Sequence, residues 1–179
     1  MILGNVSIRE ALTEGRLVLE PWLGIVGNSS ALDLRLGAKL QIPKDTPRIL
    51  DPIKGRAKDV IAEAFNERVM DSTGYVLEPQ AFVLGWTLEY VALPLQSTAN
   101  QSLAARVEGR SSLARYGLLV HFTAPTIHAG FSGNIQLEMV NLGRHPIRLV
   151  PELPICQLIL EQVHGIPERE ESQFHGQRP

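Results

Sequence analysis

Hydrophobic and polar residues alternate along several short stretches of this chain. The clearest alternation runs from Phe82 to Tyr90, and Pro94 closes it. A period of two is typical of a strand with one buried face. The same pattern predicts strands over residues 32–36, 118–123 and 135–140, a brief strand over 17–19, and a strand pair over 147–150 and 155–163.

Two stretches follow a helical period instead. Ser7 and Glu10 have the spacing of a capping box, which predicts a short helix over about 7–13 that ends at Gly15. Apolar residues between Val60 and Phe65 recur at helical spacing, which predicts one amphipathic helix over 57–69.

Short strands separated by Gly and Pro dominate the second half, which indicates a β-sandwich or barrel with peripheral helices. Residues 24–30 and 42–53 are predicted to be loops. A length of 179 residues fits a single domain over 1–179. The polar tail from about residue 167 to 179 is expected to be mobile, and its rings and amides could close over a ligand.

Composition excludes some classes of partner. The chain is 44% hydrophobic and 20% charged, as expected for a soluble protein, and its net charge of −2 does not indicate a nucleic-acid-binding surface. Its apolar runs are too short to cross a membrane. The first residues lack the features of a signal peptide, so a cytoplasmic location is the default expectation.

Cys156 is the only cysteine in the chain. A disulfide within the chain is therefore impossible, and so is a zinc site that needs two cysteine ligands from one chain. Cys156 shares a face with two leucines and is expected to lie in the core. The five histidines show no paired metal-binding spacing.

A run of residues from 109 to 115 could bind phosphate. Guanidinium groups and hydroxyls match phosphate oxygens, and both occur here in Arg110, Ser111, Ser112 and Arg115. The alternative is a surface turn that leads into a short helix with one of the serines as its N-cap.

Glu138 is the one acidic residue in the apolar strand predicted over 135–141, where it shares a face with Gln136. It either points at solvent or acts as a general base near Arg115, whose charge would keep it ionised. His121 either contacts substrate or bonds neighbouring backbone.

His128 lies in a predicted turn and could touch a sugar. Asp33 and Arg35 alternate with core leucines and are expected to form a buried or interfacial ion pair.

Residues 109–121 resemble the signature of the bacterial dCTP deaminases, and the resemblance continues in register through Thr123, Ala124, Ile127, residues 130–133 and Glu138. Residues 31–37 and the first helix resemble the same family. The resemblance implies a mainly β fold, a distorted β-barrel of the dUTPase-like β-clip type with short peripheral helices. It also implies a homotrimer with active sites between subunits.

The resemblance assigns roles to individual residues. Glu138 would be the general base, and Ser111, Arg115 and the backbone carbonyl of Ala124 would position the base and the attacking water. Phosphates would be held by Arg110, Ser111 and Ser112, and by Gln177 from the tail. Backbone near Thr123 and Gln136 would read the cytosine edge, His121 and His128 would line the substrate site, and Mg²⁺ would ride on the triphosphate without any zinc.

The implied reaction is zinc-independent deamination of dCTP to dUTP and ammonia, which supplies dUTP for thymidylate synthesis, with dTTP as a candidate inhibitor. His128 stands where many members have aspartate, which favours a deaminase that stops at dUTP. The first alternative is a bifunctional enzyme or a dUTP diphosphatase that forms dUMP and pyrophosphate. The second is a non-catalytic, nucleotide-binding regulatory protein.

Overall fold

Most strands of this protein belong to one curled antiparallel sheet. The computed structural model describes residues 1–22, 28–45, 49–51, 53 and 56–168. The strands are β1 (Val18–Glu20), β2 (Leu32–Pro43), β3 (Phe65–Val69), β4 (Tyr75–Leu77), β5 (Phe82–Ala92), β6 (Leu103–Gly109), β7 (Leu118–Val120), β8 (Thr126–Ile127), β9 (Ser132–Asn141), β10 (Ile147–Leu149) and β11 (Pro154–Gln162). The helices are α1 (Asn5–Thr13), α2 (Ala57–Ala64) and α3 (Ser111–Ala114).

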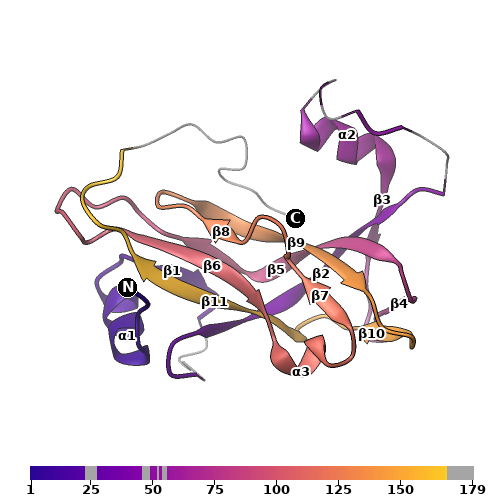
Figure 1. Ribbon diagram of the computed structural model, residues 1–179, viewed down its shortest axis with the longest axis horizontal. Helices are drawn as coiled ribbons and strands as arrows, with labels where there is room; N and C mark the ends of the chain where they lie inside the picture. Colours follow the sequence, from indigo (N-terminus) through magenta and orange to yellow (C-terminus); the bar gives the residue numbers. More distant parts are fainter. Residues whose placement is uncertain (23–27, 46–48, 52, 54–55, 169–179) are drawn as a thin grey trace.

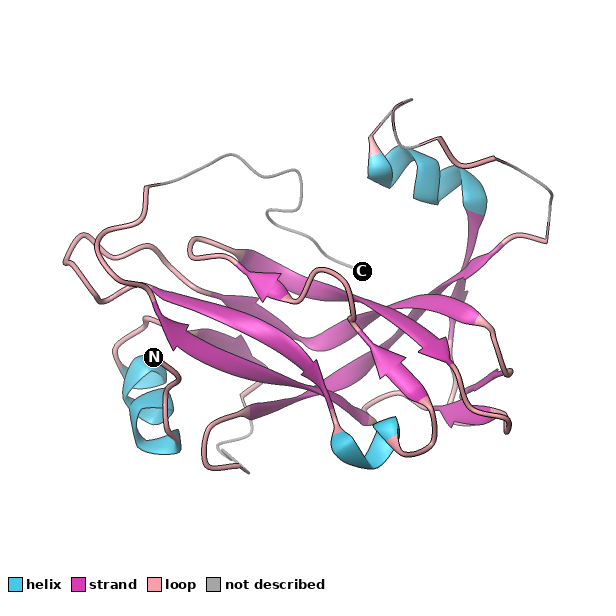
Figure 2. Ribbon diagram, viewed as in Figure 1, coloured by secondary structure: helices cyan, strands magenta, loops and turns pink. Residues whose placement is uncertain are grey.

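The large sheet has the order β7-β9-β5-β2-β11-β6-β8, with β1 added to β5 and β3 added to β2. It curls on itself, while α1, α2 and α3 lie around its periphery (Figures 1 and 2). β4 and β10 form a separate two-stranded sheet. The expected mainly β, barrel-like fold with short peripheral helices is therefore confirmed.

The core lies on the inner face of the curled sheet. The alternating leucines of β2 are fully buried there, as their pattern predicts, and β5 and β9 contribute Val83, Leu137 and Met139. Burying each such side chain contributes about 1.5–3 kcal/mol. The alternate residues of β9 therefore face outward, including Gln136 and Glu138.

The first helix begins earlier than expected. Gly4 occupies the N-cap position, so Ser7 lies inside α1 and does not cap it. The helix buries Ile8 and Ala11, and burial of this face decides where the helix packs. Gly15, at φ +72°, follows the helix end, as expected.

The single helix expected over 57–69 is wrong in its second half. α2 ends at Ala64, and Phe65 is already extended at φ −121° and ψ 152°. Residues 65–69 form β3, which pairs with β2 over its whole length. Hydrogen bonding to a neighbouring strand overrides the local helical pattern here.

Four other strands also differ from expectation. β6 was not predicted, although its burial alternates from Leu103 to Val107. β10 and β11 are not partners, because β10 pairs with β4 while β11 pairs with β2 and β6. β7 ends at Val120 rather than continuing to residue 123.

Asp33 and Arg35 do not pair with each other, contrary to expectation. Arg35 donates from its backbone N–H and its Nε to the Glu89 carboxylate, at 2.8 and 2.7 Å. Asp33 instead lies 3.3 Å from a guanidinium nitrogen of Arg110. Residues two apart on a strand share a face, but each meets partners on the neighbouring strands more readily than it meets the other.

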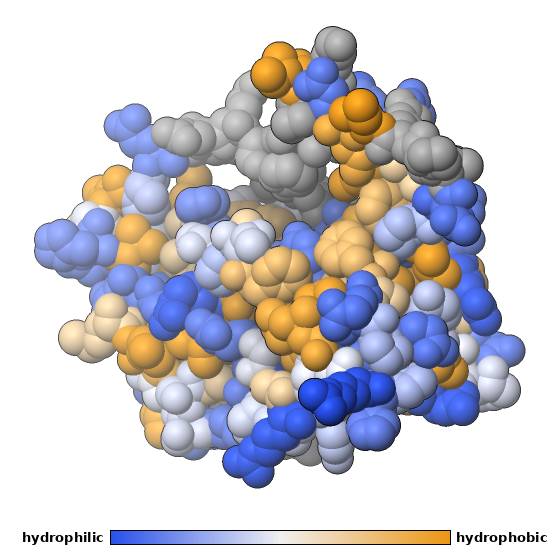
Figure 3. Space-filling model, turned by 45° about the vertical axis from the view of Figure 1, so that its right-hand side comes forward, coloured by the Kyte–Doolittle hydropathy of each residue, from blue (hydrophilic) through white to orange (hydrophobic). Residues whose placement is uncertain are grey.

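Cys156 is fully buried in β11, as expected, and this burial raises the pKa of its thiol well above the ordinary value. Hydrophobic and hydrophilic side chains are interspersed on the face shown in Figure 3. No helix in the described part of the chain is long and apolar enough to span a membrane.

Candidate active site

The predicted phosphate-binding run forms the short helix α3 and its flanks. Its N-cap is Arg110, so neither serine caps the helix as the structural alternative required. Ser111, Ser112 and Arg115 are exposed on the surface. Their hydroxyl and guanidinium groups are accessible to a ligand.

Arg110 is held in place from two sides. One guanidinium nitrogen lies 3.3 Å from Asp33, and the other donates to the carbonyl of Pro154 at 3.2 Å. Asp33 in turn accepts hydrogen bonds from Asn28 and Gln157. This network orients the guanidinium before any ligand binds.

Two glycines fix the connection between α3 and β7. Gly117 has φ +93°, and a Cβ there would lie 2.4 Å from the backbone nitrogen of Gly143. A Cβ on Gly143 would lie 2.3 Å from the carbonyl oxygen of Tyr116. The backbone of the turn after α3 therefore packs against the backbone of the loop after β9 (Figure 1). This packing fixes the position of α3 relative to β9.

Glu138 contacts a buried histidine on the outer face of the sheet. Its side chain is 31% exposed, and its Oε2 lies 2.8 Å from Nδ1 of His121, whose side chain is only 7% exposed. Burial raises the pKa of Glu138, but the contact with His121 outweighs this effect, so the pKa lies below its ordinary value. The carboxylate is therefore ionised at neutral pH.

The group that lowers the pKa of Glu138 differs from the one expected. Arg115 was expected to keep Glu138 ionised, but within one chain this role falls to His121. No interaction joins Glu138 to Ser111 or Arg115 within the described part of a single chain.

Buried polar atoms without aligned hydrogen-bond partners gather near Glu138. In the described residues these atoms are both ring nitrogens of His121, Oε2 of Glu138 and Nε1 of Trp86. The Nδ1–Oε2 approach is short, but it is not aligned as a hydrogen bond. Because buried polar groups are nearly always satisfied in proteins, such a cluster indicates a place for ligand or water.

The pairing between β7 and β9 ends where the chain reaches His121. Its φ of +53° is unusual for a residue other than glycine, and β7 ends immediately before it. The last contact is the bond from its N–H to the carbonyl of Glu138, at 2.8 Å. Beyond it, no β7 residue pairs with β9.

The main chain of Gln136 points toward the side of β9 where the β7 pairing has ended. Backbone groups of alternate strand residues point to the same edge, so Gln136 faces the β7 side as Glu138 does. The neighbouring Ile135 points the other way, because its N–H donates to Thr87 on β5. The N–H and C=O of Gln136 therefore point past the end of β7, on the same side of the strand as the backbone groups of Glu138.

The remaining predicted residues lie around this edge or outside the described part. Thr123, Ala124 and His128 are exposed in the segment that follows β7 and in the turn after β8. Gln177 lies outside the described residues, as do residues 169–179 of the predicted tail.

Sequence reasoning missed two residues that lie near Gln136 and Glu138, namely Gln41 and Trp86. The side chain of Gln136 donates to Gln41 of β2 at 2.9 Å, and Trp86 of β5 lies directly opposite Gln136. The strand alternation of Trp86 was recognised, but only the cross-strand register shows which neighbours it meets.

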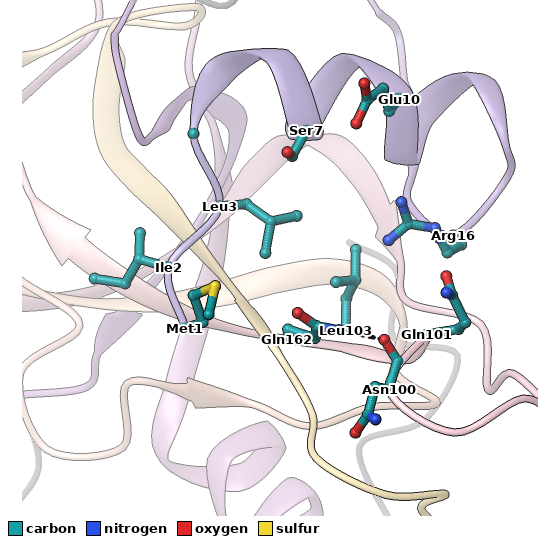
Figure 4. A pocket seen from close by; sticks show the side chains of 11 residues that line it. Met1, Ile2, Leu3, Ser7, Glu10, Arg16, Asn100, Gln101, Leu103 and Gln162 are labelled. Carbon is teal, nitrogen blue, oxygen red and sulfur yellow. Dashed lines mark hydrogen bonds between the residues drawn. The ribbon is translucent and has the colours of Figure 1, made fainter.

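A pocket of about 210 Å³ lies elsewhere, between α1 and the ends of β6 and β11 (Figure 4). Ser7, Glu10 and Arg16 contribute polar groups to it, and it contains none of the predicted site residues. In the described ranges, no group of three or more His, Cys, Asp or Glu side chains could hold a metal ion.

Comparison with known proteins agrees with the fold. The family model for dCTP deaminase-like proteins matches residues 2–163. The chain therefore belongs to the dCTP deaminase-like family.

Curated relatives carry a more specific name. The proteins from Aquifex aeolicus and Mycobacterium avium are each named "dCTP deaminase, dUMP-forming" and are 38% and 37% identical to this chain, over 99% of it and 91% and 92% of their own length. The protein of that name from Sulfurihydrogenibium sp. is 35% identical over 99% of this chain and 93% of its own.

A solved structure supports the fold alone. The 2'-deoxycytidine 5'-triphosphate deaminase from Agrobacterium tumefaciens aligns with a TM-score of 0.66 at 24% identity, over 93% of this chain and 48% of that one.

Proposed function

We propose that this protein hydrolyses dCTP to dUMP, ammonia and pyrophosphate. The observation that carries the proposal is the 2.8 Å contact of the Glu138 carboxylate with buried His121, at the point where the β7–β9 pairing ends. Membership of the dCTP deaminase-like family supports the substrate. The names of the curated relatives support dUMP, the product of the first alternative, over the dUTP that was the main expectation from the sequence.

In the proposed deamination, Glu138 accepts a proton from water as the water oxygen attacks carbon 4 of cytosine. Glu138 passes this proton to the ring nitrogen, where it stays. The second proton of the water, now on the hydroxyl at carbon 4, passes to the amino group; the bond from carbon 4 to that nitrogen breaks, ammonia leaves, and a uracil ring with a carbonyl at carbon 4 remains. The low pKa of Glu138 keeps it ready to accept the proton, and exclusion of water by bound nucleotide would strengthen it as a base.

Substrate recognition is proposed to combine backbone and side chains. The open N–H and C=O of Gln136, together with backbone at Thr123, would read the cytosine edge, and the Ala124 carbonyl would help to orient the water. His121 and His128 would line the nucleotide site, where an imidazole can bond a sugar hydroxyl.

The phosphate chain is proposed to bind at α3. Arg110, Ser111 and Ser112 would hold the phosphates of a magnesium–nucleotide complex, with Arg110 already oriented by Asp33. Gln177 would add a contact from the tail, and dTTP would compete for the same site.

Assembly as a homotrimer would complete this site. Ser111 and Arg115 do not meet Glu138 within the described part of one chain, so a second copy would supply one of the two groups. The measured mass in light scattering should be three times the 19.7 kDa of the chain. Mixing Glu138→Gln and Arg115→Ala variants should restore activity if sites are shared, and an inactive mixture of proven hetero-oligomers would contradict the sharing.

The deciding experiment separates the products formed from dCTP. We expect ammonia, pyrophosphate and dUMP in equal amounts from wild-type protein with magnesium, and Glu138→Gln should bind dCTP without turning it over. Intact dCTP after long incubation would reject deamination, and ammonia production by Glu138→Gln at the wild-type rate would reject Glu138 as the base.

A second candidate is deamination that stops at dUTP. It is favoured by His128, an exposed imidazole where many members of the family have the aspartate that helps in phosphate hydrolysis. Accumulation of dUTP without pyrophosphate would support this candidate. A third outcome, tight nucleotide binding without any turnover, would support a regulatory role instead.

A further inference from the structure

Trp86 is a buried tryptophan whose indole N–H has no hydrogen-bond partner. It is 8% exposed. A buried tryptophan N–H normally finds an acceptor, because leaving such a donor unpaired is unfavourable by about 1–3 kcal/mol. A tryptophan that only filled space could be replaced by phenylalanine or leucine without this penalty.

The position of Trp86 connects it to the candidate active site. Trp86 lies directly opposite Gln136 in the β5–β9 pair, and Leu84 lies opposite Glu138. Directly opposite residues project to the same face, and diagonal neighbours are within reach of an aromatic ring. Trp86 therefore shares the outer face of the sheet with Glu138.

The indole nitrogen of Trp86 is one of several buried polar atoms that lack hydrogen-bond partners. The buried unpaired side-chain atoms found in the described residues belong to Trp86, His121 and Glu138 alone. The side-chain amide of Gln136, which lies directly opposite Trp86, is not its partner, because this amide bonds to Gln41 and no bond links it to the indole. Three neighbouring residues with unsatisfied polar atoms point to a ligand that satisfies them together.

We propose that Trp86 is a further substrate-binding residue, whose indole N–H donates a hydrogen bond to an acceptor atom of the pyrimidine nucleotide bound beside Glu138. The indole nitrogen is a donor only, so its partner must be an acceptor. Cytosine offers a ring nitrogen and a carbonyl oxygen, and the sugar adds further oxygens. This proposal rests on the proposed function, and it extends the site from β7 and β9 onto β5.

The test uses both tryptophans of the chain. Trp86→Phe removes the N–H while it keeps an aromatic ring, and Trp22→Phe is the matched control because Trp22 is 37% exposed and lies outside the site. Loss of one hydrogen bond should raise the KM for dCTP by about tenfold in Trp86→Phe, with little change in kcat. Trp22→Phe should have wild-type KM and kcat.

A binding measurement separates substrate contact from a packing effect. In Trp22→Phe/Glu138→Gln, Trp86 is the sole tryptophan and dCTP is not consumed. Titration with dCTP should change the indole emission with the same midpoint as calorimetric binding, because the N–H gains a partner. A defect of packing alone would lower the melting temperature of Trp86→Phe without moving KM.

Either of two results would overturn the proposal. One is a wild-type KM in folded Trp86→Phe, and the other is unchanged indole emission when calorimetry shows that dCTP is bound. The first requires that wild-type protein deaminates dCTP, and the second requires only that dCTP binds, so failure of the proposed function is recognised separately by the absence of ammonia from wild-type protein.

Discussion

Removing Arg35 should destabilise the protein strongly, because Glu89 would lose its partner. The Glu89 side chain is only 5% exposed, and Arg35 reaches it with both a backbone N–H and its guanidinium. Arg35→Met keeps the volume and the backbone N–H but leaves a buried carboxylate without a cation. Breaking a buried pair in this way costs about 3–5 kcal/mol.

The size of this effect can be converted into a melting temperature. For a domain of this length, 1 kcal/mol corresponds to about 2–4 °C, so Arg35→Met should lower the melting temperature by roughly 6–20 °C. Differential scanning calorimetry at one fixed protein concentration measures the shift and avoids changes due to mass action.

Two further variants test the cause. Arg56→Met removes a similar side chain from an ion pair with Asp59 whose members are 64% and 52% exposed, so it should change the melting temperature little. Arg35→Met/Glu89→Gln removes both charges, keeps an acceptor for the backbone N–H, and should recover part of the lost stability. Equal small shifts for Arg35→Met and Arg56→Met would refute the reasoning.

Two further predictions concern the site. Because the pKa of Glu138 is lowered, kcat/KM for deamination should fall only below the ordinary glutamate value of about 4.3, as pH drops through the folded-state pKa; His121→Asn tolerates the positive φ but removes the lowering contact, so the acid limb should move to higher pH, and an unmoved limb would contradict this assignment. Gly117→Ala should lower stability by about 1–3 kcal/mol in thermal melts, since its Cβ would meet the backbone of Gly143, whereas Gly109→Ala faces open space and should be neutral; equal melting temperatures would exclude the steric account.

The sequence predicts the longest, strictly alternating strands better than it predicts the ends of the helices. Strict alternation locates β2, β5 and β9, because burial of one face dictates a period of two. The helix over 57–69 fails after Ala64, since pairing of 65–69 with β2 is a long-range contact that no local pattern reports. β6 is missed because its alanines weaken the contrast between hydrophobic and polar positions along the strand.

The candidate active site likewise has features that the sequence predicts and features that depend on long-range contacts. The chemistry of Glu138 and of the Arg110–Arg115 segment is visible in the residue types and in the resemblance to a family. The contact between Glu138 and His121 depends on a backbone angle of +53° at His121, which the sequence does not encode in any simple pattern. The residues around Trp86 are set by the register between β5 and β9. Short apolar segments do not specify this register locally, because it is fixed only when the whole sheet has formed.

The early end of β7 has a consequence for how this protein tolerates mutation. Gln136 meets the opening with its main-chain N–H and C=O, and every amino acid except proline carries the same two groups. Replacement of its side chain would therefore leave that pair of donor and acceptor unchanged. The proposed readout of a base at this edge would not depend on which side chain stands at position 136, and the cost of a replacement would be the hydrogen bond from that side chain to Gln41.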